Sequence, residues 1–228
     1  MKVIRYFLIA LVVIVVDQTS KLLVNHFMEI HEEVSVIGEW FRLHYLLNPG
    51  MAFGIRWESE FGKLALTGFR IIAMTGIGIF LFRSVQSGAH RGFLVCLALI
   101  LGGAIGNVID STFYGVFLMN APFGSPTPWF HGQVIDMLFF PLFEFYWPAW
   151  IPGVGGDHFL FFSPVFNIAD SSIFIGVTTI LLFQKKFFKE KVSTASDTES
   201  GLPPDGMSNS SDHATPGGKP EVLPVSNS

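Results

Sequence analysis

The chain has 228 residues, of which 50% are hydrophobic and 14% are charged, and its formal net charge is −4 at pH 7. A mean hydropathy of +0.50 is too high for a soluble domain of this length, so the composition indicates an integral membrane protein. The basic residues form no patch dense enough to follow a phosphate backbone, which argues against a nucleic-acid partner.

Four apolar stretches are long enough to cross a hydrocarbon core of about 30 Å. They run approximately over residues 3–24, 64–82, 92–109 and 166–183. The first could be a cleaved signal sequence, since Lys2 and Arg5 precede an apolar core. No small-x-small cleavage site follows, so a retained span is the preferred interpretation. We therefore expect a membrane all-α fold with four transmembrane helices.

Basic residues gather on one side of the membrane if the four helices alternate in direction. That side would carry Lys2, Arg5, Arg83, Arg91, Lys185, Lys186, Lys189 and Lys191. The opposite side would carry fewer, namely Lys21, Arg42, Arg56, Lys63 and Arg70. The positive-inside rule makes the first side the cytoplasm, so both termini are expected there.

The outward segments predict a small extracytoplasmic β element. Residues 34–37 and 40–47 flank Gly38 and alternate in polarity, which favours a short hairpin, and a strand-like run follows at 133–140. Residues 141–164 are rich in proline, glycine and aromatic residues, which is typical of a loop lying at the membrane interface. A lid or substrate-docking role for this loop is the alternative.

The last part of the chain differs in composition from the rest. Residues 192–228 are rich in serine, threonine, proline and glycine, lack aromatic residues and hold five acids against one lysine. Such a segment cannot bury enough apolar surface to fold. We expect a membrane-embedded domain over 1–191 and a disordered cytoplasmic tail over 192–228.

Cysteine and histidine usage gives no sign of a metal site. Cys96 is the only cysteine and lies deep in the third span, which indicates a packing role and excludes a disulfide within the chain. His131 and His158 belong to no metal-binding spacing, so we expect surface or capping roles. No metal or cofactor is predicted.

Polar residues inside the apolar spans are the candidates for a site. A carboxylate costs roughly 2.5–3.5 kcal/mol at a helix centre, so it is kept when it pairs, lines a wet cavity or acts on a substrate. Asp17 and Lys21 are one turn apart and can pair. Asn107 and Asp110 follow a small-residue stripe at Gly102, Gly103 and Gly106 that allows close helix packing.

Two further acids lie toward the end of the membrane part of the chain. Asp136 stands alone inside the apolar run 134–138. Asn167 and Asp170 are predicted to lie on one face in the first two turns of the fourth span. An acid in a first helical turn can also be explained as a partner of the helix dipole.

Five blocks of small and polar residues follow one another along the chain. They are Asp17-Gln-Thr-Ser-Lys21, Asn48 to Gly54, Gly102 to Asp110, Val134-Ile-Asp136 and Phe166-Asn167-Ile-Ala-Asp170. In this order they resemble the signature motifs of the lipoprotein signal peptidases, the type II signal peptidases of bacteria, over about Tyr6 to Lys186. The resemblance implies that Asp136 and Asp170 are the catalytic pair. It also implies that Asp17, Lys21, Asn48, Gly50, Asn107, Asp110 and Asn167 support the site or bind substrate.

The same resemblance implies an activity and a location. The protein would be a membrane aspartyl endopeptidase that removes signal peptides from prolipoproteins on the amino side of a diacylglyceryl-modified cysteine. It would be a multi-pass protein of the bacterial cytoplasmic (inner) membrane, with its active site at the outer face, no cofactor, contact with membrane lipid, and a monomeric state.

The chain departs from the family pattern in two places. Family members commonly carry arginine directly after the third-span aspartate, where this chain has Ser111. Any contact made by that arginine is therefore absent here or supplied elsewhere. The segments between Asp110 and Asp136 and between Asp136 and Asp170 are also longer than usual, which affects the shape of the outer part.

Two other functions are compatible with acids in a membrane. The acids could form a proton or cation path in a small transporter, or polar residues could hold the helices of a scaffold protein together. The acids cluster at one membrane face and the spans show no inverted repeat, which argues against a transporter.

Overall fold

A computed structural model describes residues 2–50, 60–141, 143–153, 155–161 and 164–188. These residues all belong to one compact unit, Met1–Lys189. The motif positions Ala52, Phe53 and Gly54 lie outside the described residues, as does the tail from residue 192. The predicted boundary at residue 191 and the disorder of the tail therefore stay predictions.

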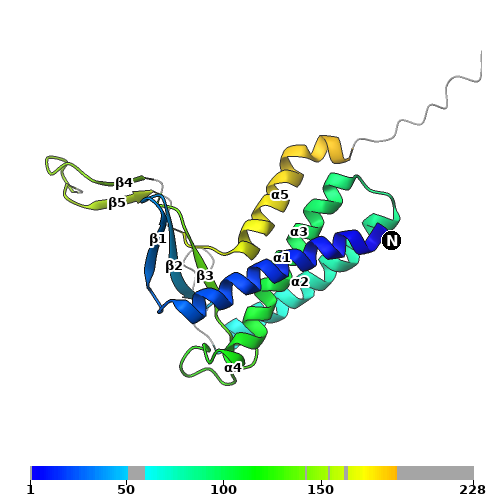
Figure 1. The fold of residues 1–228 in the computed structure, drawn as a ribbon, viewed down its shortest axis with the longest axis horizontal. Coiled ribbons are helices and arrows are strands. Elements are labelled where there is room, and N and C mark those ends of the chain that lie inside the picture. The colour runs from blue at the N-terminus through cyan, green and yellow to red at the C-terminus, as the bar shows by residue number, and fades with distance from the viewer. Residues whose placement is uncertain (1, 51–59, 142, 154, 162–163, 189–228) are drawn as a thin grey trace, which may run out of the picture. The chain divides into compact units, whose positions relative to one another are not determined.

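Four helices are long and apolar enough to cross a membrane, which confirms the four predicted spans. They are α1 (Lys2–Phe27), α2 (Glu60–Gln86), α3 (Arg91–Ile109) and α5 (Ile168–Phe187). Beyond α3 the chain continues through a π-helical turn, η1 (Asp110–Tyr114), into the short α4 (Gly115–Phe117). Figure 1 shows α3 among the other long helices, and it contacts α1, α2 and α5.

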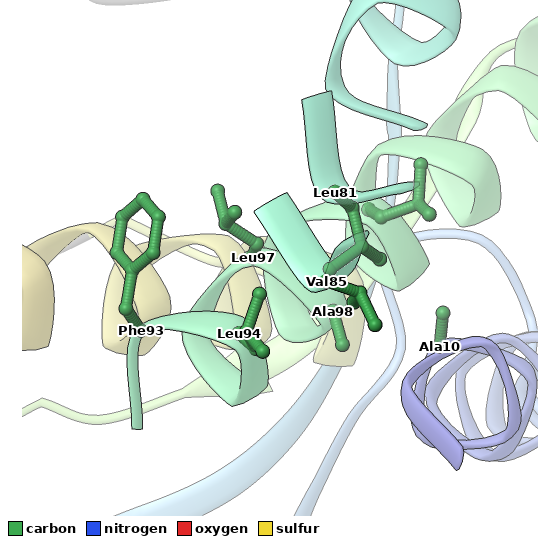
Figure 2. Packing of buried hydrophobic residues seen from close by; sticks show 8 residues of the cluster. Ala10, Leu81, Val85, Phe93, Leu94, Leu97 and Ala98 are labelled. Atoms are coloured by element: carbon green, nitrogen blue, oxygen red, sulfur yellow. The ribbon is translucent and has the colours of Figure 1, made fainter. Parts of the chain in front are cut away.

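The core of the helical part is formed by apolar residues that α3 presents to α1 and α2. Figure 2 shows Leu94, Leu97 and Ala98 of α3 with Leu81 and Val85 of α2, and the full cluster is Ala10, Leu81, Val85, Phe93, Leu94, Leu97, Ala98 and Leu101. Cys96 is also buried, at 4% exposure, as predicted for a packing residue.

Glycines let the backbones of neighbouring helices approach α3 closely, as the small-residue stripe predicts. A Cβ added to Gly102 would lie 2.8 Å from the carbonyl oxygen of Ala10 in α1. A Cβ added to Gly103 would overlap the carbonyl oxygen of Ala169 in α5. Lipid gives little hydrophobic drive for helix association, so such close contact is a main source of attraction between the helices.

The segments between α1 and α2 and between α4 and α5 contribute a three-stranded antiparallel sheet in the order β1-β2-β3. The predicted hairpin is confirmed as β1 (Glu33–Ile37) and β2 (Phe41–Asn48), and the strand-like run as β3 (Val134–Phe139). β3 pairs with β2 so that Asp136 lies opposite Leu46. Phe166, which lies just before α5, bridges to Leu138 of β3 through two backbone hydrogen bonds of 2.7 and 3.1 Å.

The structure corrects two predictions about residues 141–170. The segment expected to be a loop contains a second hairpin, β4 (Phe143–Tyr146) and β5 (His158–Phe161), because its aromatic runs favour strands despite the flanking prolines and glycines. α5 begins at Ile168, so Asn167 is its N-cap rather than a residue of its first turns. Asn167 therefore lies where the chain passes from the edge of the sheet into the helix.

Candidate active site

A buried ion cluster links α1, η1 and the start of α5. The Lys21 ammonium lies 2.8 Å from Asp17 Oδ2 and 2.7 Å from Asp110 Oδ2, and all three side chains are 0% exposed. The predicted Asp17–Lys21 pair is thus present, with Asp110 of η1 as a second partner. Asp17 Oδ1 accepts a 2.8 Å hydrogen bond from the backbone N–H of Ala169, so it also binds the N-terminus of α5.

Asp136 is held on β3 by two asparagine side chains. Its side chain is 3% exposed, and its two carboxylate oxygens accept hydrogen bonds from Asn167 Nδ2 at 2.7 Å and from Asn48 Nδ2 at 3.0 Å. Burial, followed by the nearby charge of Asp170, raises the pKa of Asp136 to about 7, although the asparagine donors and Lys21 act in the opposite direction. Asp136 is therefore able to hold a proton near neutral pH.

Asp170 lies in the first turn of α5 and is partly exposed. Its Oδ1 accepts a 2.7 Å hydrogen bond from Asn107 Nδ2. Its backbone N–H donates to Asn167 Oδ1 at 2.8 Å, which is the N-cap contact of the helix. The two amide groups of Asn107 and Asn167 thus fix the positions of both members of the predicted pair.

Gly50 follows β2 in a conformation that requires glycine. Its φ is +96°, and a Cβ at this position would come within 2.6 Å of Leu66 in α2. Its N–H donates a 2.8 Å hydrogen bond to Asn48 Oδ1, which orients the Asn48 amide toward Asp136. A larger residue here would disturb the support of Asp136.

The structure brings all the sequence-predicted site residues into one connected network. Lys21 Nζ also contacts Asn107 Oδ1 at 3.2 Å, and Asn167 Nδ2 approaches the same oxygen at 3.4 Å, so the ion cluster is linked to Asp136 and Asp170. The members are Asp17, Lys21, Asn48, Gly50, Asn107, Asp110, Asp136, Asn167 and Asp170. They come from α1, the end of β2, α3, η1, β3 and the start of α5.

Sequence reasoning did not identify three members of the site, namely Gln18, Tyr114 and Arg70. Gln18 donates to Asp110 Oδ1 at 2.8 Å and accepts a 2.9 Å hydrogen bond from the Tyr114 hydroxyl. Arg70 of α2 donates a 2.8 Å hydrogen bond to Ser111 Oγ, so a guanidinium is present beside the residue that stands in place of the family's arginine. The position of Arg70 inside an apolar span was a usable signal, because a charge there is costly.

His131 differs from the expected surface role. It is 2% exposed, and its Nδ1 lies 2.9 Å from the carbonyl oxygen of Trp129. It is buried because its segment packs on η1, where the N–H of Gly132 donates to the carbonyl of Ser111 at 3.0 Å. The side chain of His158 lies outside the described residues. Within the described ranges, no group of three or more His, Cys, Asp or Glu side chains is arranged to hold a metal.

A family model described as signal peptidase (SPase) II matches residues 9–186. The chain belongs to the signal peptidase II family. Lipoprotein signal peptidases of Amoebophilus asiaticus and Porphyromonas gingivalis are 41% and 44% identical to it, over 87% and 74% of this chain and 85% and 77% of theirs. That of Chlorobium phaeobacteroides is 32% identical over 80% of this chain and 97% of its own.

Solved structures support the fold of this signal peptidase II family member. Two chains, each described as a bacterial membrane enzyme, superimpose with a TM-score of 0.52. One is 24% identical and covers 87% of this chain, and the other is 26% identical and covers 80% of it. The matched regions make up 94% and 93% of these two chains. The protein is thus a peptidase with several membrane helices.

Proposed function

We propose that the protein is an aspartyl endopeptidase that removes the signal peptide from lipid-modified prolipoproteins, on the amino side of the diacylglyceryl-cysteine. The observation that carries this proposal is the pairing of Asp136 with Asp170 through Asn167 and Asn107. One carboxyl is buried on a strand, and the other is partly exposed at the start of a helix. This difference in environment suits two carboxyls with different protonation states.

The pair divides the work of peptide hydrolysis. Asp136, whose pKa of about 7 lets it keep a proton, acts as the acid, and the more exposed Asp170 acts as the base. Asp170 takes a proton from water as the water oxygen bonds to the scissile carbonyl carbon, while Asp136 gives its proton to the carbonyl oxygen. The C–N bond then breaks as the proton on Asp170 passes to the leaving amine. Asp136 recovers its proton when the carbonyl reforms, so one water is consumed.

The other residues of the network position this pair. Asn48, Asn107 and Asn167 donate to the carboxylates, and Gly50 orients Asn48. The ion cluster of Asp17, Lys21 and Asp110 holds α1, η1 and the start of α5 together next to the pair. We assign them support of the site or contact with substrate rather than proton transfer.

We place the site at the outer face of the bacterial inner membrane, with both termini in the cytoplasm. The distribution of lysine and arginine supports this orientation. The names of the relatives support prolipoprotein substrates, and the modified cysteine would sit in contact with membrane lipid. We further propose a monomeric peptidase domain over 1–191 and a disordered cytoplasmic tail over 192–228.

The test is replacement of each acid by asparagine, which keeps the size but removes the exchangeable proton. Cleavage of a lipid-modified precursor by purified Asp136→Asn or Asp170→Asn protein should fall by about 10² to 10⁴-fold. The double variant should be no worse than either single one, because groups acting as a unit are not additive. Glu39→Gln, whose carboxylate is 85% exposed, is the matched control and should retain activity.

Each variant must insert and accumulate as the parent protein does, so that lost cleavage reports chemistry rather than folding. Substantial cleavage by purified Asp170→Asn, or its restoration by added zinc, would exclude the aspartyl mechanism.

A further inference from the structure

Lys21 is engaged by groups other than the catalytic pair. Its ammonium donates hydrogen bonds to Asp17 Oδ2 at 2.8 Å and to Asn107 Oδ1 at 3.2 Å. It also forms an ion pair with Asp110 Oδ2 at 2.7 Å. The positive charge of Lys21 is therefore mainly balanced by two carboxylates other than Asp136 and Asp170.

Arg70 brings a second positive charge to the site from α2. Its Nη1 donates to Ser111 Oγ at 2.8 Å, and the Ser111 hydroxyl in turn donates to the carbonyl oxygen of Asn107 at 2.9 Å. Ser111 is 0% exposed, so this anchor is buried. On its other side the guanidinium meets Gly50, where a Cβ would lie 3.7 Å from Nη2 and 3.9 Å from Nη1.

These contacts hold the guanidinium between the end of β2 and η1. Gly50 binds the amide that supports Asp136, and Asn107 binds Asp170, so Arg70 is adjacent to the supports of both acids. Its charge interacts favourably with the carboxylates of Asp170, Asp110 and Asp136. A guanidinium stays protonated at all working pH values, so this field is permanent.

We propose that Arg70, anchored on Ser111, is a positioning residue that sets the pH range in which Asp136 and Asp170 share one proton. The inference rests on the proposed aspartyl mechanism and assigns it an electrostatic control from α2. A fixed cation near two carboxyls favours the state in which one of them is ionised, which is the state that the reaction needs.

The charges that face the pair determine the direction of the pH effect. Asp136 faces Asp170 on α5 and Lys21 on α1, and Arg70 adds its charge from α2 while Asp110 adds a negative one from η1. Lys63, which precedes Arg70 on α2, carries a charge of the same sign and repels it. Removing the Arg70 charge leaves the carboxylates less well compensated, so the pair should keep its protons to higher pH.

The experiment measures kcat and KM across pH for purified protein acting on a lipid-modified precursor. Arg70→Gln should shift the acid limb of the kcat profile upward by about 1 pH unit, so that kcat on that limb falls by up to about ten-fold. Arg70→Lys should keep the limb near its original position. The exchange variant Arg70→Ser with Ser111→Arg returns a guanidinium to the same place and should recover at least part of both losses.

Arg83→Gln at the other end of α2 is the matched control, because its side chain is exposed and should change neither kcat nor the profile. An Arg70→Gln profile that superimposes on the parent profile would overturn the inference. So would a fall in kcat with an unmoved limb that the exchange variant does not restore, because that result would show a structural role only.

Melting temperature in detergent identifies variants that have lost their fold. Should Arg70→Gln fail to accumulate, the exchange variant decides, since an inactive but folded exchange protein contradicts the inference. Asp136→Asn, measured in parallel, separates this inference from the mechanism. If Asp136→Asn is active the mechanism fails, and if it is inactive while Arg70→Gln behaves like the parent, only the role of Arg70 fails.

Discussion

Asp136 is held in a position that opposes its ionisation. The pKa of its buried carboxyl is raised from 3.8 to about 7. The folded protein therefore binds this proton more tightly than the unfolded chain does between those two pH values. The stability that the protonated group contributes is complete below about pH 4 and is lost as the pH rises through about 7.

Asp136→Asn should consequently gain stability relative to the parent protein as the pH rises. The shift of about three pKa units corresponds to a relative gain of about 4 kcal/mol at most, reached above about pH 8. Melting curves of both purified proteins in detergent between about pH 5 and pH 8.5 measure this difference. Asp157→Asn, at an exposed position between β4 and β5, is the control and should show no such trend. A stability difference that stays constant over this range would mean that Asp136 does not become a buried charge.

At the scale of secondary structure, the spacing between α3 and α5 decides the geometry of the site. Gly103 lets α5 approach until α3 meets the backbone of Ala169. The neighbouring residue, Asp170, then comes within 2.7 Å of Asn107 on α3. The small-residue stripe thus serves the site as well as the packing of the helices.

Gly103→Val should impair cleavage more than it impairs insertion or accumulation. The added side chain must displace α5, and overpacking of this kind typically costs about 1–3 kcal/mol. The displacement breaks the Asn107–Asp170 contact, so activity should fall about ten-fold or more. A ten-fold fall corresponds to about 1.4 kcal/mol of activation free energy. Cleavage assays at equal protein level measure it.

Gly76→Val on α2 is the matched control, because nothing lies within 4 Å of a Cβ at Gly76. Normal activity in Gly103→Val with an unchanged melting temperature would show that the close approach of α5 is not needed for the site.

The elements that the sequence predicted well are those with a strong local signal. The four spans follow from length and hydropathy, and the β1–β2 hairpin follows from alternation around Gly38, which adopts a φ of +52°. The β4–β5 hairpin was missed because proline and glycine cues outweighed its aromatic residues. The N-cap role of Asn167 was missed because the apolar run placed the start of the span at about residue 166, although asparagine is itself a preferred N-cap residue.

For the whole molecule, the resemblance named the site residues, but their contacts required the fold. Gln18 and Asp110 are 92 positions apart, and Arg70 and Ser111 are 41 apart. Such pairings arise only when α1, α2 and α3 pack together, so motif spacing cannot predict them. The sequence left open whether the contact of the family arginine is absent here or supplied elsewhere, and the structure puts the Arg70 guanidinium beside Ser111.

The orientation of the whole molecule can be tested by labelling single cysteines. The native Cys96 is buried and should stay unreactive, so Ser125→Cys and Ser87→Cys each introduce one accessible thiol. With four alternating spans and a cytoplasmic N-terminus, a membrane-impermeant maleimide should label Ser125→Cys in intact spheroplasts, and Ser87→Cys only after lysis. The reverse pattern would place the site on the cytoplasmic side and contradict the proposed location.

Asn167 makes two contacts that we expect no other residue to reproduce together. Its Nδ2 donates to Asp136, and its Oδ1 accepts from the N–H that begins α5. Aspartate lacks the donor, serine is too short, and glutamine is longer by one methylene, so each exchange gives up a contact of the acid pair or the cap of the helix. Under selection by an inhibitor that binds Asp136 and Asp170, we expect resistance variants to arise at other residues. A substitution at Asn167 should lower activity as well as inhibitor affinity.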